Sequence, residues 1–216
     1  FSARLRMAYL TNKSGKLNEA RQILHKTATK NNQQRIQLAM VEAQILRDAK
    51  QFESAYQVLM QGLEKLPNQP DLMYEAAMLA DKAGKHDAFE QMMRKLIEIE
   101  PDNAQAYNAL GYGLLERNER VPEAMKLVEK AYQLAPEDAG IIDSMGFGYY
   151  RSGNLSKSLE FLRRAYAANP DPEIAAHLGE VLWVQGEKEQ AKKMWNDALM
   201  ANPGSTVLQL VIKKFT

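Results

Sequence analysis

The amino-acid sequence predicts an all-α fold in which helical hairpins stack into a solenoid. The first observation behind this prediction is a series of prolines spaced by 34, 35, 34 and 33 residues: Pro67, Pro101, Pro136, Pro170 and Pro203. The second is a small residue at a matching place before each of them: Ala43, Ala77, Gly111, Gly146 and Gly179. Apolar residues between these marks recur with a helical period, and no pattern typical of a β-strand competes. Because small residues let two helices cross closely, each period is interpreted as one hairpin.

Helix ends between and within the hairpins carry their own signals. A proline beyond a helix end cannot continue the hydrogen-bond ladder, and an Asp or Asn that follows it can cap the next helix. Segments of this kind occur at 67–71, 101–103 and 136–138. Glycine marks the turn inside several hairpins, at Gly84, Gly153 and Gly186.

The spacing of these prolines and small residues resembles the tetratricopeptide repeat, which has small residues at its eighth, twentieth and twenty-seventh positions and a proline at its thirty-second. The resemblance implies a right-handed α-α superhelix, treated as a single domain over residues 1–216. About six repeats fit the chain, at 1–35, 36–69, 70–103, 104–138, 139–171 and 172–204, and a capping helix follows at 205–216.

Three repeats depart from the family pattern. The first has two asparagines at 31–32 where the proline should stand, which leaves its boundary the least defined. The third places Phe89 and Leu96 where the family prefers alanine, and the fourth carries one extra residue near 121–122. We expect local distortion in the third and fourth repeats.

The final segment has the pattern of a capping helix. Its apolar residues recur at i, i+3, i+4 and i+7 and are expected to cover the exposed end of the sixth repeat: Leu208, Val211, Ile212 and Phe215. Val207 and Leu210 lie off this stripe. Their exposure on the outer face of the cap would favour self-association, so a homo-oligomer is one expectation.

Composition argues against several classes of function. The formal net charge is +1, whereas a general nucleic-acid binder needs a clustered excess of Lys and Arg. Pentatricopeptide RNA readers share a similar period, but the glycine and alanine phases and the lack of a basic face favour the tetratricopeptide interpretation. No apolar run is long enough to form a membrane span. The chain has no cysteine, which removes disulfides and thiolate chemistry.

Motifs for catalysis, cofactors or metals are not found, so the sequence predicts neither an enzyme nor a cofactor. Three histidines lie in different repeats without carboxylates at ligand spacing, and are interpreted as surface or groove residues: His25, His86 and His177. The two Gly-x-Gly segments lack the preceding strand and third glycine of a dinucleotide-binding loop. The repeat pattern gives no reason for Gly113 and Gly148.

The tetratricopeptide resemblance places the binding surface on the first helix of each hairpin. Carried onto this sequence, it predicts a protein- or peptide-binding groove lined by Tyr74, Met78, Asn108, Tyr112, Asp143, Phe147, Tyr150, Arg151, Glu180 and Trp183. The large apolar members are surplus to the packing positions of the repeat and are candidate hot spots. The alternative is that some of them pack against neighbouring repeats. No repeat carries the lysine and asparagine clamp of chaperone-tail binders, which favours an apolar segment as the ligand.

A closer resemblance covers the C-terminal half, through segments 143–147, 162–166 and 169–183 and Trp195. These are similar to the last repeats of a group of proteobacterial tetratricopeptide proteins, some of them outer-membrane lipoproteins. One member of that group is an adaptor that brings a periplasmic carboxyl-terminal processing protease together with cell-wall hydrolase substrates. The resemblance implies a periplasmic adaptor tethered through a lipidated cysteine upstream of Phe1, with a cytoplasmic location as the alternative. A regulatory or targeting module of a larger enzyme is the alternative function.

Overall fold

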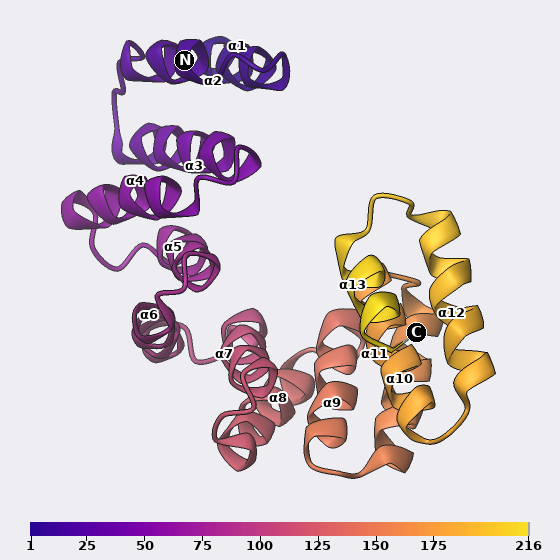
Figure 1. Ribbon diagram of the computed structural model, residues 1–216. Helices are drawn as coiled ribbons and strands as arrows, with labels where there is room; N and C mark the ends of the chain where they lie inside the picture. Colours follow the sequence, from indigo (N-terminus) through magenta and orange to yellow (C-terminus); the bar gives the residue numbers. More distant parts are fainter. Residues whose placement is uncertain (216) are drawn as a thin grey trace. The chain divides into compact units, whose positions relative to one another are not determined.

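The computed structural model describes residues 1–215, and these form thirteen α-helices without a β-strand (Figure 1). The helices are α1 (Ser2–Lys13), α2 (Leu17–His25), α3 (Asn32–Asp48), α4 (Phe52–Lys65), α5 (Pro70–Lys82), α6 (His86–Ile99), α7 (Ala104–Glu116), α8 (Val121–Leu134), α9 (Ala139–Arg151), α10 (Leu155–Ala168), α11 (Pro172–Val184), α12 (Lys188–Ala201) and α13 (Thr206–Phe215). The predicted all-α class is confirmed, and so is the order of six hairpins followed by one further helix.

Each hairpin except the fourth closes with a turn of three residues. The predicted glycines Gly84, Gly153 and Gly186 all have positive φ angles in these turns, which glycine adopts without steric cost. The fourth hairpin has a turn of four residues at 117–120, where Asn118 and Arg120 have φ angles of 56° and 43°. The extra residue predicted in the fourth repeat therefore lengthens this turn and leaves its two helices intact.

Helix capping follows the predicted signals in two of the three segments. The Asn103 side chain accepts a hydrogen bond from the backbone N–H of Ala106, and that of Asp138 accepts from Gly140 and Ile141. The segment after Pro67 differs, because the N-cap residue of α5 is Gln69 and its side chain makes no capping bond. There, Pro70 begins the helix, at a position where its missing N–H is not needed.

The junction of the first two repeats is the least regular one. α2 ends at His25, earlier than the equivalent helices of later hairpins, and α3 begins at residue 32 instead of the predicted 36. The Asn31 side chain accepts from the N–H of Gln34, so this asparagine caps α3 in the absence of the usual proline. In the third repeat, by contrast, Phe89 and Leu96 are buried while α6 keeps the same length as α4, so the expected distortion does not reach the helix bounds.

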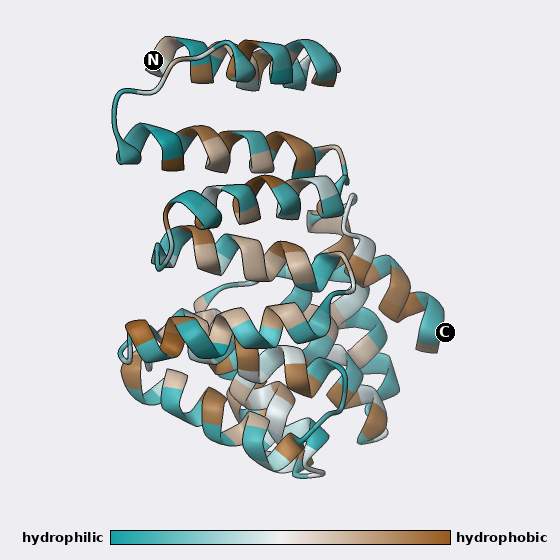
Figure 2. Ribbon diagram, turned by 90° about the vertical axis from the view of Figure 1, so that its left-hand side faces the viewer, coloured by the Kyte–Doolittle hydropathy of each residue, from teal (hydrophilic) through white to brown (hydrophobic). Residues whose placement is uncertain are grey.

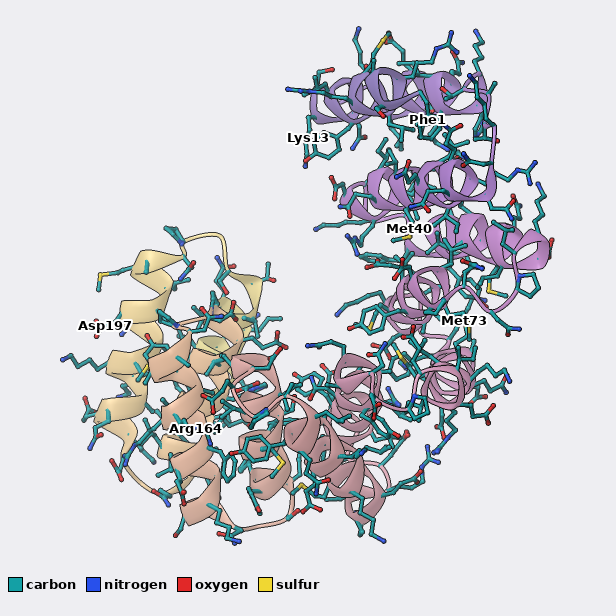
Figure 3. The ribbon with its side chains drawn as sticks, turned by 180° about the vertical axis from the view of Figure 1, so that it is seen from behind. Phe1, Lys13, Met40, Met73, Arg164 and Asp197 are labelled. Atoms are coloured by element: carbon teal, nitrogen blue, oxygen red, sulfur yellow. The ribbon has the colours of Figure 1, made fainter. Side chains whose placement is uncertain are left out.

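The helices group into two compact units, residues 1–101 and 102–216, which are described separately. Unit 1 contains α1 to α6, with fully buried side chains along its stack such as Leu24, Leu46, Leu59 and Met93. Met73, labelled in Figure 3, belongs to the same core on α5. Polar and apolar residues alternate along these helices, as in amphipathic helices that bury one face (Figure 2).

Unit 2 contains α7 to α13, and its hairpins cross closely at glycines. A Cβ atom on Gly111 would meet Val128 of α8, and one on Gly146 would meet Leu162 of α10. Gly148 shows the same effect, because an added Cβ would overlap the Met125 sulfur. Helix packing thus explains Gly148, for which the repeat pattern gave no reason.

Side chains from the second helices tie successive hairpins of unit 2 together. Arg164 of α10, labelled in Figure 3, donates to the Tyr132 hydroxyl at 2.6 Å and to the Pro136 carbonyl at 2.7 Å. Its guanidinium also lies 5.5 Å from the Tyr132 ring centre.

The last helix, α13, packs on α11 and α12 as the predicted cap. Leu208 and Val211 are buried, and the Phe215 ring lies 5.7 Å from that of Trp183 and 5.6 Å from that of Trp195. Figure 2 shows α13, which ends at the label C, as a largely hydrophobic helix. Within residues 1–215, no helix is both long enough and apolar enough to cross a membrane.

Candidate functional site

One concave site of unit 2 is a cleft of about 260 Å³ between the first helices of three hairpins and α13, which we call the α13 cleft. α7, α9 and α11 contribute one ring each: Tyr112, Phe147 and His177. α13 supplies the opposite wall through Val207 and Leu210. A neighbouring cleft of about 300 Å³ shares Tyr112 with it and is lined further by Asn108 and Asp143.

A buried pair of charged groups lies beside the α13 cleft. His177 Nδ1 is 2.9 Å from Oδ2 and 3.1 Å from Oδ1 of Asp143, and the two residues are only 9% and 5% exposed. Burial lowers the pKa of His177, but the charge and hydrogen bond of Asp143 raise it by more. The pKa of His177 therefore lies above its ordinary value of 6.5, and the pair joins α9 to α11.

Tyr112 links the buried pair of His177 and Asp143 to the exposed carboxylate of Glu173. Its hydroxyl donates to Glu173 Oε1 at 3.0 Å and lies 3.4 Å from His177 Nε2. Burial and the nearby charges of Glu173 and Glu116 raise the pKa of Tyr112 far above its usual range, so the phenol stays neutral and acts as a donor. Four side chains from three successive hairpins are thus joined in one network, Asp143–His177–Tyr112–Glu173.

Phe147 lies between the other two ring residues of the site in sequence order, and its ring contacts both Tyr112 and His177. Its ring stacks on His177 at 4.5 Å between ring centres and lies 5.6 Å from Tyr112. Phe147 is only 5% exposed, so the expectation that it is surplus to the core is wrong. It contacts the next hairpin, which is the packing alternative considered for these residues.

Trp183 is likewise part of the core instead of a free groove residue. Its ring stacks on Trp195 at 5.9 Å and is covered by Phe215 of α13. The ammonium groups of Lys188 and Lys192 lie 5.1 Å and 5.9 Å from its centre. The premise that Trp183 is surplus to the core is therefore wrong, and a direct contact with a ligand stays a prediction.

Glu180 and Tyr150 form a second polar group at the α13 cleft. The Tyr150 hydroxyl and the Lys214 ammonium both donate to Glu180 Oε1 at 3.1 Å. Burial and the adjacent Glu180 charge raise the pKa of Tyr150. Lys214 belongs to α13, so this ion pair helps to hold α13 against α11.

Two polar atoms at the clefts are buried without a hydrogen-bond partner. One is Oδ1 of Asn108, and the other is Nε of Arg151. The Arg151 guanidinium lies 4.8 Å from the Phe147 ring centre, and its Nη2 makes only a long contact of 3.4 Å with the Glu116 carbonyl oxygen. A buried polar atom without a partner costs free energy, which a ligand group of the right kind would recover.

The remaining predicted groove residues, Tyr74 and Met78, lie in unit 1. Both are half-buried on α5. α3 and α5 line a smaller cleft of about 190 Å³, where Arg47 donates to Glu75 at 2.9 Å and Met40, labelled in Figure 3, forms part of the wall. The predicted set is therefore divided between the two units, and only the members of unit 2 are described here as one site.

His25 and His86 are exposed, as expected of surface residues, whereas His177 is buried beside the α13 cleft. Each has a carboxylate partner: Glu42 for His25 at 2.9 Å, Asp81 for His86 at 3.0 Å, and Asp143 for His177. Among residues 1–215, no three His, Asp or Glu side chains are grouped to hold a metal ion. A sequence signal for the buried pair exists, because Asp143 and His177 are 34 residues apart, about one repeat.

Other site residues gave weaker signals in the sequence. Glu116 and Glu173 sit at the C-terminal and N-terminal ends of their helices and show no special pattern. Val207 and Leu210 were noted only as lying off the packing stripe of the cap, whereas both line the α13 cleft.

Comparison with known proteins agrees with this architecture. A curated TPR repeat-containing protein of Pseudomonas aeruginosa is 42% identical over 178 residues, which cover 82% of this chain and 30% of that protein. The chain thus spans less than a third of that relative's length. A thermophilic TPR protein from Thermus thermophilus superimposes with a TM-score of 0.71 at 21% identity, over 83% of this chain and 96% of that structure. YrrB, described as a TPR protein with an unusual peptide-binding site, superimposes with a TM-score of 0.59 at 18% identity, over 82% and 90%.

These two structural likenesses are too distant in sequence to show more than a shared fold. The family assignment rests on the match of a tetratricopeptide repeat family model to residues 2–203, nearly the whole chain. The hairpins, the turn glycines and the close crossings of unit 2 are the features that this family requires. The chain belongs to the tetratricopeptide repeat family.

Proposed function

We propose that this protein is a non-catalytic adaptor that binds a peptide segment of a partner protein in the α13 cleft of unit 2. Tetratricopeptide repeat proteins are scaffolds for protein interactions, and the cleft is built from the first helices of three successive hairpins. The observation that carries the proposal is the combination of an apolar wall with a buried polar atom, Nε of Arg151, that lacks a partner.

The unpartnered atoms favour a peptide as the ligand over a purely apolar molecule. Arg151 Nε can donate a hydrogen bond to a backbone carbonyl, and Asn108 Oδ1, in the neighbouring cleft, can accept one from a backbone N–H. An extended chain offers both groups at every residue, and its side chains can enter the adjacent apolar space. The peptide-binding site described for YrrB, a protein of the same fold, gives further support.

The finer proposal is that the partners are a carboxyl-terminal processing protease and its cell-wall hydrolase substrates, in the bacterial envelope. It rests on the resemblance of segments 143–147, 162–166 and 169–183 and of Trp195 to proteobacterial adaptors. Binding enzyme and substrate on one body raises their effective concentration, so stimulation needs no catalytic group in the adaptor. A regulatory or targeting module remains the alternative function, because this chain corresponds to less than a third of the Pseudomonas aeruginosa relative.

The test uses the protein, the purified protease and a hydrolase from the same organism. We expect the cleavage rate to rise with adaptor concentration and then to fall, because excess adaptor binds the two partners separately. Leu210→Asp should reduce this stimulation, since Leu210 is 67% exposed and lines the cleft. Met200→Asp is the matched control, since Met200 is 73% exposed on α12. Equal loss in both variants, or no stimulation by folded wild-type protein, would contradict the adaptor proposal at this site.

A further inference from the structure

The last helix has an apolar face that packing covers only in part: Val207 packs partly against the core, and Leu210 is 67% exposed. Its buried stripe includes Leu208 and Phe215, which contact the aromatic core. Val207 and Leu210 lie on a different side of α13, three residues apart, and both line the α13 cleft. Because Leu210 is largely exposed, this wall presents an apolar surface that unit 2 leaves partly uncovered.

Two carboxylates on the opposite side of the cleft have no cation partner. Glu116 ends α7 and Glu173 begins α11, and both are exposed. Their charges act on the hydroxyl of Tyr112, which donates to Glu173, so both lie near that atom. Within residues 1–215, neither carboxylate forms an ion pair with a lysine or arginine.

Two of the three cations that line the α13 cleft are paired with carboxylates, whereas Nε of Arg151 has no partner. Lys214 pairs with Glu180, and His177 pairs with Asp143. Arg151 lies over the Phe147 ring and points one nitrogen at a backbone carbonyl at the C-terminal end of α7. Three carboxylates line the cleft, those of Glu116, Glu173 and Glu180, against the charges of Arg151 and Lys214, and Asp143 balances His177, so a positive group from outside would be favoured there.

We propose that the cleft selects a partner segment in which a lysine or arginine lies next to a large apolar residue. The cation would lie between Glu116 and Glu173, close to Tyr112, and the apolar side chain would pack against Val207 and Leu210. This inference rests on the proposed peptide-binding function and adds the chemistry of the bound segment. It also gives a role to the two residues of α13 that would otherwise suggest self-association.

The experiment is a selection of random twelve-residue peptides, displayed on phage, against three forms of the purified protein. These are the wild type, the double variant Glu116→Gln/Glu173→Gln, and the control Glu129→Gln/Glu160→Gln. The control removes the same charge from exposed positions on α8 and α10, outside the cleft. We expect the wild type and the control to enrich peptides with Lys or Arg beside Leu, Ile or Phe, and the cleft variant to lose this preference.

Affinity measurements by calorimetry on the best synthetic peptide complete the test. The cleft variant should bind about tenfold more weakly than the wild type at low salt, since each half-exposed ion pair changes a binding constant by a few-fold. Enriched peptides that are acidic or neutral but still depend on Leu210 would overturn the charge inference and leave the proposed function standing. No enrichment by folded wild-type protein would overturn both. Dimers that Leu210→Asp dissociates would identify a second copy as the occupant and would also overturn the inference.

Discussion

The closest helix crossing in unit 2 gives the sharpest prediction, because replacing Gly179 by alanine should destabilise the C-terminal hairpin. Gly179 lies in α11 against Trp195 of α12, and an added Cβ would overlap three atoms of the indole ring. The indole cannot easily move aside: Trp195 is fully buried, stacks on Trp183 and Phe215, and donates from Nε1 to the Ala176 carbonyl at 3.3 Å.

Two opposing effects decide the size of the change. Alanine in a helix interior is favoured over glycine by about 1 kcal/mol. Overpacking a filled core costs about 1–3 kcal/mol, and the upper part of this range applies because the indole is fully buried and packs against the rings of Trp183 and Phe215. We therefore expect a net loss of about 2 kcal/mol, which corresponds to a fall in melting temperature of about 4–8 °C for a chain of this size.

Tryptophan fluorescence is a suitable assay because both tryptophans of the chain, Trp183 and Trp195, lie in unit 2. Gly62→Ala is the matched control. A Cβ there would meet only Leu72 at 3.4 Å and Ala39 at 3.7 Å, so circular dichroism should report equal or slightly greater stability of unit 1. If Gly179→Ala melts at or above the wild-type temperature, the packing argument for the glycine crossings is refuted.

Three further predictions concern the other features of unit 2. Phe147→Ala should lower the free energy of unfolding by about 3–5 kcal/mol in chemical denaturation, because the ring is buried, whereas a groove residue would cost much less. The pair of His177 and Asp143 should stabilise the fold fully below pH 6.5, and this contribution should be lost as the pH rises through the raised folded pKa of His177. Melting curves between pH 6 and pH 9 should therefore show a falling melting temperature for the wild type, and Asp143→Asn should abolish this fall. Deleting residues 205–216 should expose Trp195 and cause aggregation that light scattering detects, and a monomeric deletion variant of equal stability would contradict the capping role.

Local signals predicted most of the fold because they act within a few residues. Prolines and turn glycines restrict the backbone directly, so the hairpin turns at Gly84 and Gly153 follow from the sequence. The extra residue of the fourth repeat was also local and was absorbed by the turn at 117–120. The start of α3 was missed by four residues, because asparagine capping replaced the expected proline.

The candidate site was harder to predict because it depends on contacts between repeats. Phe147 and Trp183 occupy positions that face the groove in the family, yet each turns toward a ring of a neighbouring helix. The pairing of Asp143 with His177 joins residues about one repeat apart, so their spacing places them on neighbouring hairpins but does not show that their side chains meet. Leu210 could be placed off the packing stripe, but only the packing of α13 on α11 brings it to the cleft.

The aromatic cluster under α13 also implies an uneven order of local opening along the chain. Stability in a solenoid is approximately a sum of terms for single repeats and their neighbours, so the ends can unravel independently. The first hairpin buries only small or medium side chains, namely Ala8, Ala20 and Leu24, whereas the last one buries Trp195 in a cluster with the rings of Trp183 and Phe215. Amide hydrogens of α1 and α2 should therefore exchange with solvent well before those of α11. The α13 cleft should accordingly be among the last parts of the chain to open.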